Sequence, residues 1–199
     1  MGTHALRKRA NWQDQGGKKA GIAESNFYKI FDKEFAGTDF QIRSHPPEFK
    51  NIYSKIVLTS EVLASIYTPK GETWKHGIIP DYAIDNLKTK KTLYVEVKRQ
   101  DGWVEGKQRK AGRGNVHERS CKFFTPGLLK ILREQGKIGN DILPFWVVFQ
   151  GDIARDPKRV REITCWYAEQ SDHFFMWGDS SDKQPLLNHF NKKLRHLLT

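Results

Sequence analysis

Apolar positions along the chain follow two periods, one typical of helices and one typical of strands. Between Ala20 and Phe35 they recur every three or four residues, which predicts an amphipathic helix that packs on a core. A second helical pattern begins near Ser60, whose hydroxyl can cap it, and ends before Pro69. Between the two, Asp39–Arg43 is predicted to be a short strand. We expect both helices to flank a central sheet.

Strand patterns occupy the middle of the chain. Ile78–Asp85 and Thr92–Arg99 are joined by the polar turn Asn86–Lys91, an arrangement typical of an antiparallel hairpin. Because side chains alternate along a strand, the second strand has a polar face and an apolar face. The polar face carries Thr92, Tyr94, Glu96 and Lys98, and the apolar face carries Leu93, Val95 and Val97. We expect the apolar face to join the core and the polar face to belong to a site.

A polar loop and a helical segment follow this hairpin. Arg99–Gly114 is rich in Gly and Lys, which is typical of a mobile, solvated loop near a phosphate backbone. A helical pattern then runs from Asn115 or Val116 to Glu134, bends or restarts at Thr125–Pro126, and is closed by Gly136. The apolar stretches of this helix favour packing on the sheet.

The last part of the chain alternates strand and helix patterns. The near-continuous apolar run Ile142–Phe149 predicts a central strand buried on both faces. Asp156–Pro157 opens a helix. Its inward stripe is Val160, Ile163, Trp166 and Tyr167, and its outer side is Arg155, Lys158, Arg159 and Arg161. Phe174–Trp177 is predicted to be a strand and Gln184–Leu198 a closing helix.

This order of elements predicts one α/β domain over residues 1–199, with a mixed central β-sheet flanked by α-helices. The chain has 199 residues, enough for one sizeable core and too few to favour two domains. Residues 1–17 are polar and basic and are expected to form an N-terminal arm or lead-in.

Charge and cysteine content narrow the class of protein. A formal net charge of +11 favours a polyanionic partner, with nucleic acid as the leading candidate, although a merely soluble basic surface would have the same charge.

Cys121 and Cys165 stand apart, which indicates neither a zinc site nor a disulfide framework and fits a reducing, cytoplasmic setting. The sequence shows no export signal or long apolar stretch, so we expect no membrane partner.

Candidate chemistry lies on the central hairpin. Pro80–Asp81 and Glu96-Val97-Lys98 place two carboxylates and an ammonium on adjacent strands. Asp81, Glu96 and the backbone carbonyl of Val97 are oxygen ligands suited to Mg²⁺, and Lys98 can approach a phosphate and an attacking water. The alternative is a surface hairpin with a cross-strand ion pair, because so short a motif also occurs by chance.

A candidate DNA-reading segment follows the hairpin. Arg113 to Arg119 combines two guanidiniums, an amide and a glycine; Arg matches guanine and Asn matches adenine in the major groove. The alternative is an ordinary helix start capped by Asn115. His117 is interpreted as a variable position inside this segment rather than a catalytic residue. His76 is interpreted as structural or solvent-facing rather than a metal ligand.

These residues resemble the PD-(D/E)XK type II restriction endonucleases of the EcoRI group, and in particular its MunI-like members. Pro80–Asp81 with Glu96-Val97-Lys98 matches the nuclease core pattern, and the run 114–119 matches the recognition pattern G-N-A-x-E-R. Val116 stands where the group usually has Ala. The resemblance extends over nearly the whole chain.

The resemblance implies a homodimeric, Mg²⁺-dependent enzyme that cuts both strands of double-stranded DNA at a palindrome with an AATT centre, leaving four-base 5′ overhangs. Asp81, Glu96 and Lys98 would be catalytic. Gly114, Asn115, Val116 and Arg119 would face the inner bases, Glu118 would orient the arginines, and Arg113 would read the outer pair in favour of C/AATTG. A companion DNA methyltransferase in the host is implied as well, though not as a stable partner.

Three other functions compete with this interpretation. A structure-selective or repair nuclease would need the catalytic residues but not the recognition segment. A non-catalytic basic DNA-binding protein explains the charge but leaves two carboxylates near the DNA backbone unexplained. A structural or protein-interaction module explains the apolar stripes and little else.

Overall fold

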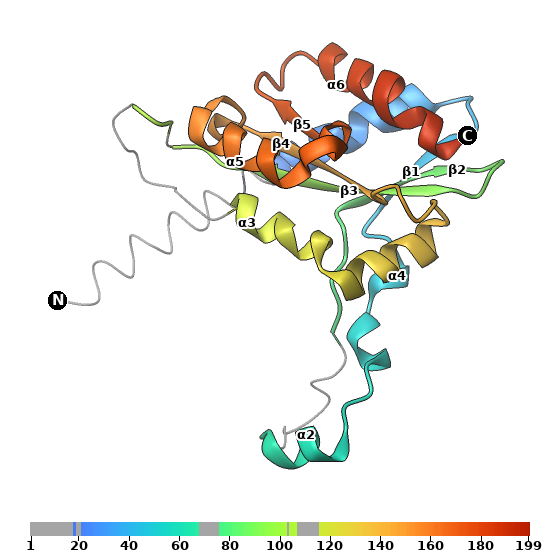
Figure 1. Ribbon diagram of the computed structural model, residues 1–199. Coiled ribbons are helices and arrows are strands. Elements are labelled where there is room, and N and C mark those ends of the chain that lie inside the picture. Colours follow the sequence, from blue (N-terminus) through green and yellow to red (C-terminus); the bar gives the residue numbers. More distant parts are fainter. Residues whose placement is uncertain (1–17, 19–20, 68–75, 103, 107–115) are drawn as a thin grey trace.

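The computed structural model describes residues 18, 21–67, 76–102, 104–106 and 116–199. Within these residues, five strands form one mixed sheet in the order β1-β2-β3-β4-β5 (Figure 1). They are β1 (Phe40–Ser44), β2 (Tyr82–Asn86), β3 (Thr92–Arg99), β4 (Phe145–Gln150) and β5 (Phe174–Trp177). The first three are antiparallel neighbours, and β4 and β5 continue the sheet parallel to β3. The predicted mixed sheet flanked by helices is confirmed.

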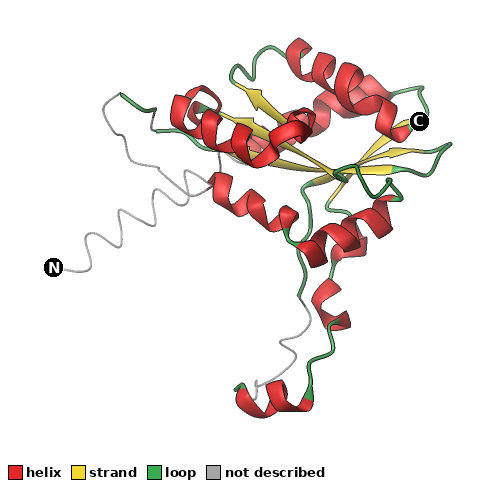
Figure 2. Ribbon diagram, viewed as in Figure 1, coloured by secondary structure: helices red, strands yellow, loops and turns green. Residues whose placement is uncertain are grey.

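Helices cover both faces of the sheet (Figure 2). One is the N-terminal helix, which covers residues 21–35. The other α-helices are α2 (Ser60–Ser65), α3 (Val116–Ser120), α4 (Pro126–Gly136), α5 (Pro157–Tyr167) and α6 (Gln184–His189). Shorter turns of helix are η1 (Pro47–Phe49), η2 (Ile52–Lys55), η3 (Cys121–Phe124), η4 (Asp152–Arg155), η5 (Ala168–His173), η6 (Phe190–Leu194) and η7 (Arg195–Leu198).

Two apolar clusters hold the layers together. On one face, the N-terminal helix and the segment from α6 to η7 pack through Phe27, Phe31 and Phe190 against Val95 and Trp146 of the sheet. On the opposite face, η3, α4 and α5 pack on the sheet. That second cluster includes Tyr94, Phe123, Leu132, Phe145, Val147 and Ile163. The sheet is therefore the middle layer of three.

The structure corrects the prediction that one face of β3 is polar and belongs only to a site. Thr92, Tyr94 and Glu96 are buried, at 7%, 1% and 3% exposure. Tyr94 is covered by α4 and by Phe49, whose ring meets it edge-on at 4.8 Å. A two-residue period shows which side chains share a face, but not whether a distant helix covers them.

Strand boundaries agree with the sequence to within one residue, except beside prolines. The bounds of β3 and β5 are as predicted, and β1 is shifted by one residue. The predicted central strand is β4, which is buried along its whole length but covers Phe145–Gln150 instead of Ile142–Phe149. The hairpin's first strand, however, begins at Tyr82 instead of Ile78. Pro80 has no N–H to donate to a ladder, so regular pairing starts after it.

The helix predicted from Ser60 is shorter and differently placed than expected. Thr59, rather than Ser60, caps α2 by accepting the Val62 N–H at 3.4 Å. None of its residues is buried, and it projects away from the sheet (Figure 1). Apolar side chains at helical spacing therefore do not flank the sheet here.

The other helices match their patterns with local differences. In α5, Arg159 is 5% exposed although it was expected outside, whereas Trp166 is 36% exposed although it was expected inside. Gly136 is the last residue of α4, and Lys137 takes the left-handed conformation that ends the helix. Position 136 requires a glycine for a steric reason, because a Cβ there would lie 2.8 Å from the Thr92 carbonyl oxygen.

Two further expectations concern membranes and cysteines. Among the described residues, no helix is both long and apolar enough to span a bilayer. Cys121 and Cys165 are free thiols, which agrees with the expected lack of a disulfide.

Candidate active site

The end of the β2–β3 ladder creates the candidate site. Regular pairing between the two strands stops at Tyr82 and Val95, so the backbone of Val97 has no β2 partner. The Asp81 carboxylate takes that place and accepts the Val97 N–H at 2.7 Å. The Val97 carbonyl opens to the same edge, since the N–H and C=O of one strand residue point the same way.

Glu96 and Lys98 bring opposite charges to this edge. The Asp81 backbone N–H donates to Glu96 Oε2 at 3.3 Å, which ties the two acidic residues together. Lys98 Nζ lies 2.5 Å from Glu96 Oε1 and 3.7 Å from Asp81 Oδ2. The three side chains predicted from the sequence are thus brought together in one compact cluster.

Burial and mutual charge change the titration of these groups. Burial first, and then the Glu96 carboxylate, raise the pKa of Asp81 to about 6, against the opposing influence of Lys98. Burial lowers the pKa of Lys98, but Glu96 and Asp81 outweigh it and raise that pKa above its usual value. Lys98 is therefore an ammonium at neutral pH, and Asp81 a carboxylate that protonates readily.

Two residues of the site were not found by sequence reasoning. Lys122 of η3 places Nζ 3.1 Å from Glu96 Oε1. Glu24 of the N-terminal helix is half-buried and interacts electrostatically with Asp81, Glu96 and Lys98. Burial raises the pKa of Glu24, Lys98 opposes this rise and Glu96 adds to it. Neither residue has a local signal, because each reaches the site through the packing of a distant helix.

The donor set fits a hard divalent cation. Asp81, Glu96 and the Val97 carbonyl offer oxygen atoms at one edge, leaving room for water and phosphate as further ligands. Among the described residues, no three His, Cys, Asp or Glu side chains gather as a metal site. A metal here would accordingly depend on two carboxylates and a backbone oxygen, as expected from the sequence.

The described part of the recognition segment forms α3. Val116 is half-buried, whereas Glu118 and Arg119 are exposed. His117 between them is 1% exposed and stacks on Trp166 of α5, with ring centroids 5.5 Å apart and planes 2° from parallel. His117 is therefore a buried residue that packs α3 against α5, a role that its interpretation as a variable position did not include. Arg113, Gly114 and Asn115 lie outside the described residues.

The loop after β3 is held at its start. Gln100 is 6% exposed and exchanges backbone hydrogen bonds with Gln150 and Ile153. The Gly102 and Glu105 N–H groups donate to Asp152 and Asp156, at 2.7 and 3.2 Å. The predicted solvated loop is therefore fixed over these residues, and much of its remainder, 103 and 107–114, lies outside the described chain.

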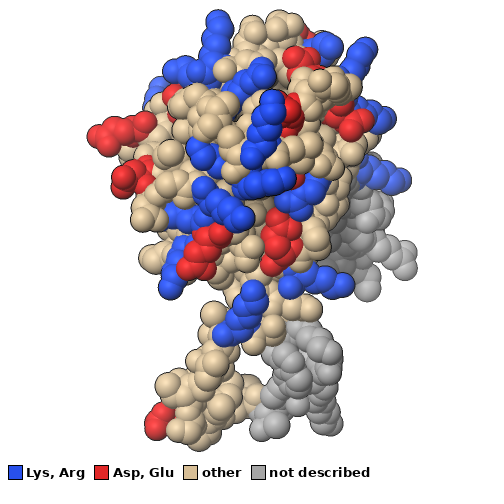
Figure 3. Space-filling model, turned by 90° about the vertical axis from the view of Figure 1, so that its right-hand side faces the viewer, with Lys and Arg blue, Asp and Glu red and all other residues tan. Residues whose placement is uncertain are grey.

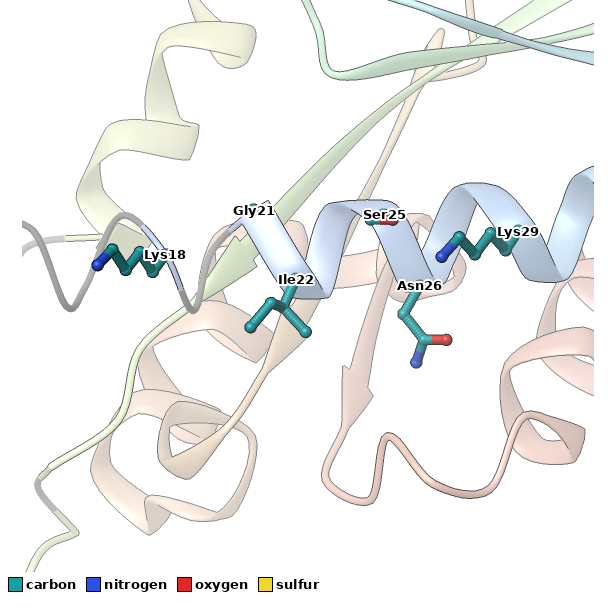
Figure 4. A pocket seen from close by; sticks show the side chains of 6 residues that line it. All are labelled: Lys18, Gly21, Ile22, Ser25, Asn26 and Lys29. Carbon is teal, nitrogen blue, oxygen red and sulfur yellow. The ribbon is translucent and has the colours of Figure 1, made fainter.

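A hollow lies along the N-terminal helix (Figure 4). It is lined by Lys18, Gly21, Ile22, Ser25, Asn26 and Lys29. Glu24 does not line the hollow and instead interacts electrostatically with Lys98 and Glu96. The hollow contains no acidic group, so we assign the chemistry to the strand edge.

Comparison with known proteins gives matches that extend over nearly the whole chain. The family described as "Type II restriction enzyme MunI" matches residues 1–199. The type II restriction enzyme MunI of Mycoplasma sp is 51% identical over 201 residues, covering 100% of each chain. The crystal structure of MunI restriction endonuclease in complex with cognate DNA superposes with a TM-score of 0.80 at 51% identity, covering 95% of this chain and 98% of that one. The chain belongs to the MunI family of type II restriction enzymes.

Proposed function

We propose that this restriction enzyme hydrolyses phosphodiester bonds at the strand edge formed by Asp81, Glu96 and Lys98, with Mg²⁺ held by Asp81, Glu96 and the Val97 carbonyl. The observation that carries the proposal is the cluster itself, in which one ammonium lies 2.5 Å from the buried Glu96 carboxylate and 3.7 Å from the half-buried Asp81 carboxylate. Mg²⁺ bound there would supply Lewis-acid stabilisation of charge on the phosphoryl oxygens and on the departing 3′ oxygen.

Each side chain has a separate part in this chemistry. Asp81 is fixed by the Val97 N–H and Glu96 by the Asp81 N–H, so both carboxylates are oriented before substrate arrives. Lys98 is charged, and it would stabilise negative charge on the scissile phosphate and orient the attacking water. Glu96 is 3% exposed, so its carboxylate is shielded from bulk solvent.

We further propose that the cleaved sequence is a palindrome with an AATT centre, cut as C/AATTG to leave four-base 5′ overhangs. Support comes from the solved MunI structure, which is a complex with cognate DNA, and from the run 114–119 in this chain. Asn115, Val116 and Arg119 would face the inner bases, and Glu118 would orient the arginines. Arg113 would read the outer pair.

The surface supports DNA binding over the body of the protein and a protein contact elsewhere. Lysine and arginine side chains gather on the face seen in Figure 3, whereas the segment that projects at the bottom is almost uncharged. Between Ile56 and Tyr67 there is no lysine or arginine. We propose a homodimer, because a palindrome presents the same half-site twice, with this apolar segment in the subunit contact.

The proposal extends to the whole chain and its setting. We propose that residues 1–199 act as one endonuclease domain, with residues 1–17 as a basic arm. The free thiols of Cys121 and Cys165 fit a reducing compartment, so we place the activity in the cytoplasm, with a companion methyltransferase in the host.

Digestion of a DNA of known sequence, with and without Mg²⁺, tests three proposals together: the hydrolysis of DNA, its dependence on Mg²⁺ and the recognition sequence. We expect discrete fragments only with Mg²⁺, with ends that map to C/AATTG. Asp81→Asn and Glu96→Gln should give no cutting, and Arg113→Ala should relax discrimination at the outer pair more than at AATT. Diffuse products would contradict site-specific cleavage, and an unchanged outer-pair preference would remove the role of Arg113.

A further inference from the structure

Glu96 Oε1 is shared by two ammonium groups. Lys98 Nζ lies 2.5 Å and Lys122 Nζ 3.1 Å from that one oxygen, and the other oxygen, Oε2, accepts the Asp81 N–H. Both oxygens of the carboxylate are therefore engaged in the free protein. Two positive charges at Oε1 also oppose the approach of a divalent cation to the same atom.

The two lysines differ in how firmly they are held. Lys98 belongs to β3, its side chain is 18% exposed, and it also approaches Asp81 Oδ2 and the Val97 carbonyl, at 3.7 and 3.5 Å. Lys122 belongs to η3, its side chain is 32% exposed, and its Nζ lies over the Phe123 ring, 4.8 Å from the centroid. Lys98 is therefore the more buried of the two and has further oxygen partners at the site, so the Lys122 ammonium can leave Glu96 more easily.

Its position in the chain links Lys122 to DNA binding. η3 begins directly after α3, which carries the exposed Glu118 and Arg119 of the recognition segment. A DNA backbone that reaches Asp81 and Glu96 would bring phosphate oxygens close to Glu96 Oε1, where Lys122 already lies. The negative charge of Glu96 is already shared with Lys98. A DNA phosphate would therefore attract the Lys122 ammonium more strongly than Glu96 does.

We propose that Lys122 alternates between two partners, the Glu96 carboxylate in the free enzyme and a phosphate of bound DNA, and that in the first position it hinders metal binding at Glu96. This inference rests on the proposed function, in which Glu96 is a metal ligand. Lys122 is thus a positioning residue that makes the metal site more available once DNA is bound.

Mn²⁺ binding to the DNA-free protein, followed by the electron paramagnetic resonance of free Mn²⁺, tests the first position. Lys122→Met should bind Mn²⁺ about fivefold more tightly than the wild type, as loss of one partly screened charge at a ligand predicts. Lys122→Arg should restore the wild-type affinity. The matched control is Lys130→Met on α4, whose side chain is 76% exposed and pairs with Glu134, and it should bind as the wild type.

The salt dependence of binding to a CAATTG duplex without metal tests the second position. Lys122→Met should bind DNA more weakly and lower the slope of log K against log salt by about one, the signature of one lost phosphate contact. Lys130→Met should leave the slope unchanged. An unchanged slope for Lys122→Met overturns the phosphate contact.

The Mn²⁺ result separates this inference from the proposed function. An affinity of Lys122→Met equal to or weaker than that of the wild type overturns the inference, provided that Glu96→Gln loses Mn²⁺ binding. If Glu96→Gln binds Mn²⁺ as the wild type does, the metal site itself is wrongly assigned and both proposals fail. Thermal unfolding of each variant shows whether the fold is retained.

Discussion

Val97 donates its backbone N–H to the Asp81 carboxylate at 2.7 Å, so the side chain of one residue completes the hydrogen bonding of the next strand. The carboxylate is held in place by the sheet and not by a flexible loop. That placement has a cost, because burial and Glu96 raise the pKa of Asp81 to about 6. The fold thus keeps an oriented carboxylate at this position at a cost in stability.

Removal of the Asp81 charge should therefore stabilise the fold. A pKa raised in the folded state means that protonated Asp81 favours folding below its unfolded pKa of 3.8, and that this contribution is lost as pH rises through about 6. At pH 8, Asp81→Asn should raise the free energy of unfolding by about 1–3 kcal/mol. Urea unfolding at pH 8 and pH 4.5 measures it. The gain should shrink at the lower pH, and an equal gain at both values would contradict the titration argument.

Cleavage should fall on acidification because the proton and the metal compete for Asp81. With its pKa raised to about 6, Asp81 is a carboxylate above that pH and a neutral acid below it. At subsaturating Mg²⁺, the single-turnover rate should drop by about tenfold per pH unit below the midpoint. Raising Mg²⁺ should move the midpoint to lower pH. A midpoint that does not respond to Mg²⁺ would assign the transition to another group.

Glu24 should tune this titration from the N-terminal helix. Its charge adds to the rise in the pKa of Asp81, so Glu24→Gln should move the acid midpoint of cleavage to lower pH. Glu34→Gln is the matched control, since Glu34 lies on the same helix but is exposed. Coincident pH profiles for Glu24→Gln and the wild type would show that the two carboxylates are not coupled.

Sequence reasoning found the elements and the strand carboxylates because their signals are local. Alternation and flanking turns set the bounds of Thr92–Arg99, and the same alternation put Glu96 and Lys98 on one face, where the structure has them. Whether another segment covers a side chain is not a local property of the sequence. It depends on how distant segments pack, and this packing decides the burial of Arg159, the exposure of α2 and the approach of Glu24 and Lys122 to the site.

His117 shows the same limit inside a recognised motif. The sequence marks it as a variable position, but the structure uses it to fix α3 on α5: its ring stacks on Trp166, and Nε2 lies 3.5 Å from Glu162 Oε2. His117→Ala should leave a hole under α3 and weaken binding to CAATTG DNA by more than about tenfold, with a smaller effect on non-cognate DNA. Cys165→Ala, an exposed neighbour on α5, is the control. Equal losses on both duplexes would show a general loss of fold instead.

The apolar segment around α2 should carry part of the subunit contact. Val57 and Leu63 are 92% and 56% exposed. Apolar side chains exposed to this extent do not stabilise a single subunit, but they would stabilise a subunit contact that buries them. Val57→Glu and Leu63→Glu should each weaken dimerisation by at least about tenfold, because each would bury an unpaired carboxylate in the subunit contact. Ile22→Glu is the matched control, since Ile22 is apolar and 67% exposed but lies outside the segment.

Sedimentation equilibrium with and without DNA measures the effect of these substitutions on dimerisation. A dimer unaffected by both substitutions would move the contact to another surface, and a monomeric wild type in both states would remove the proposed dimer altogether.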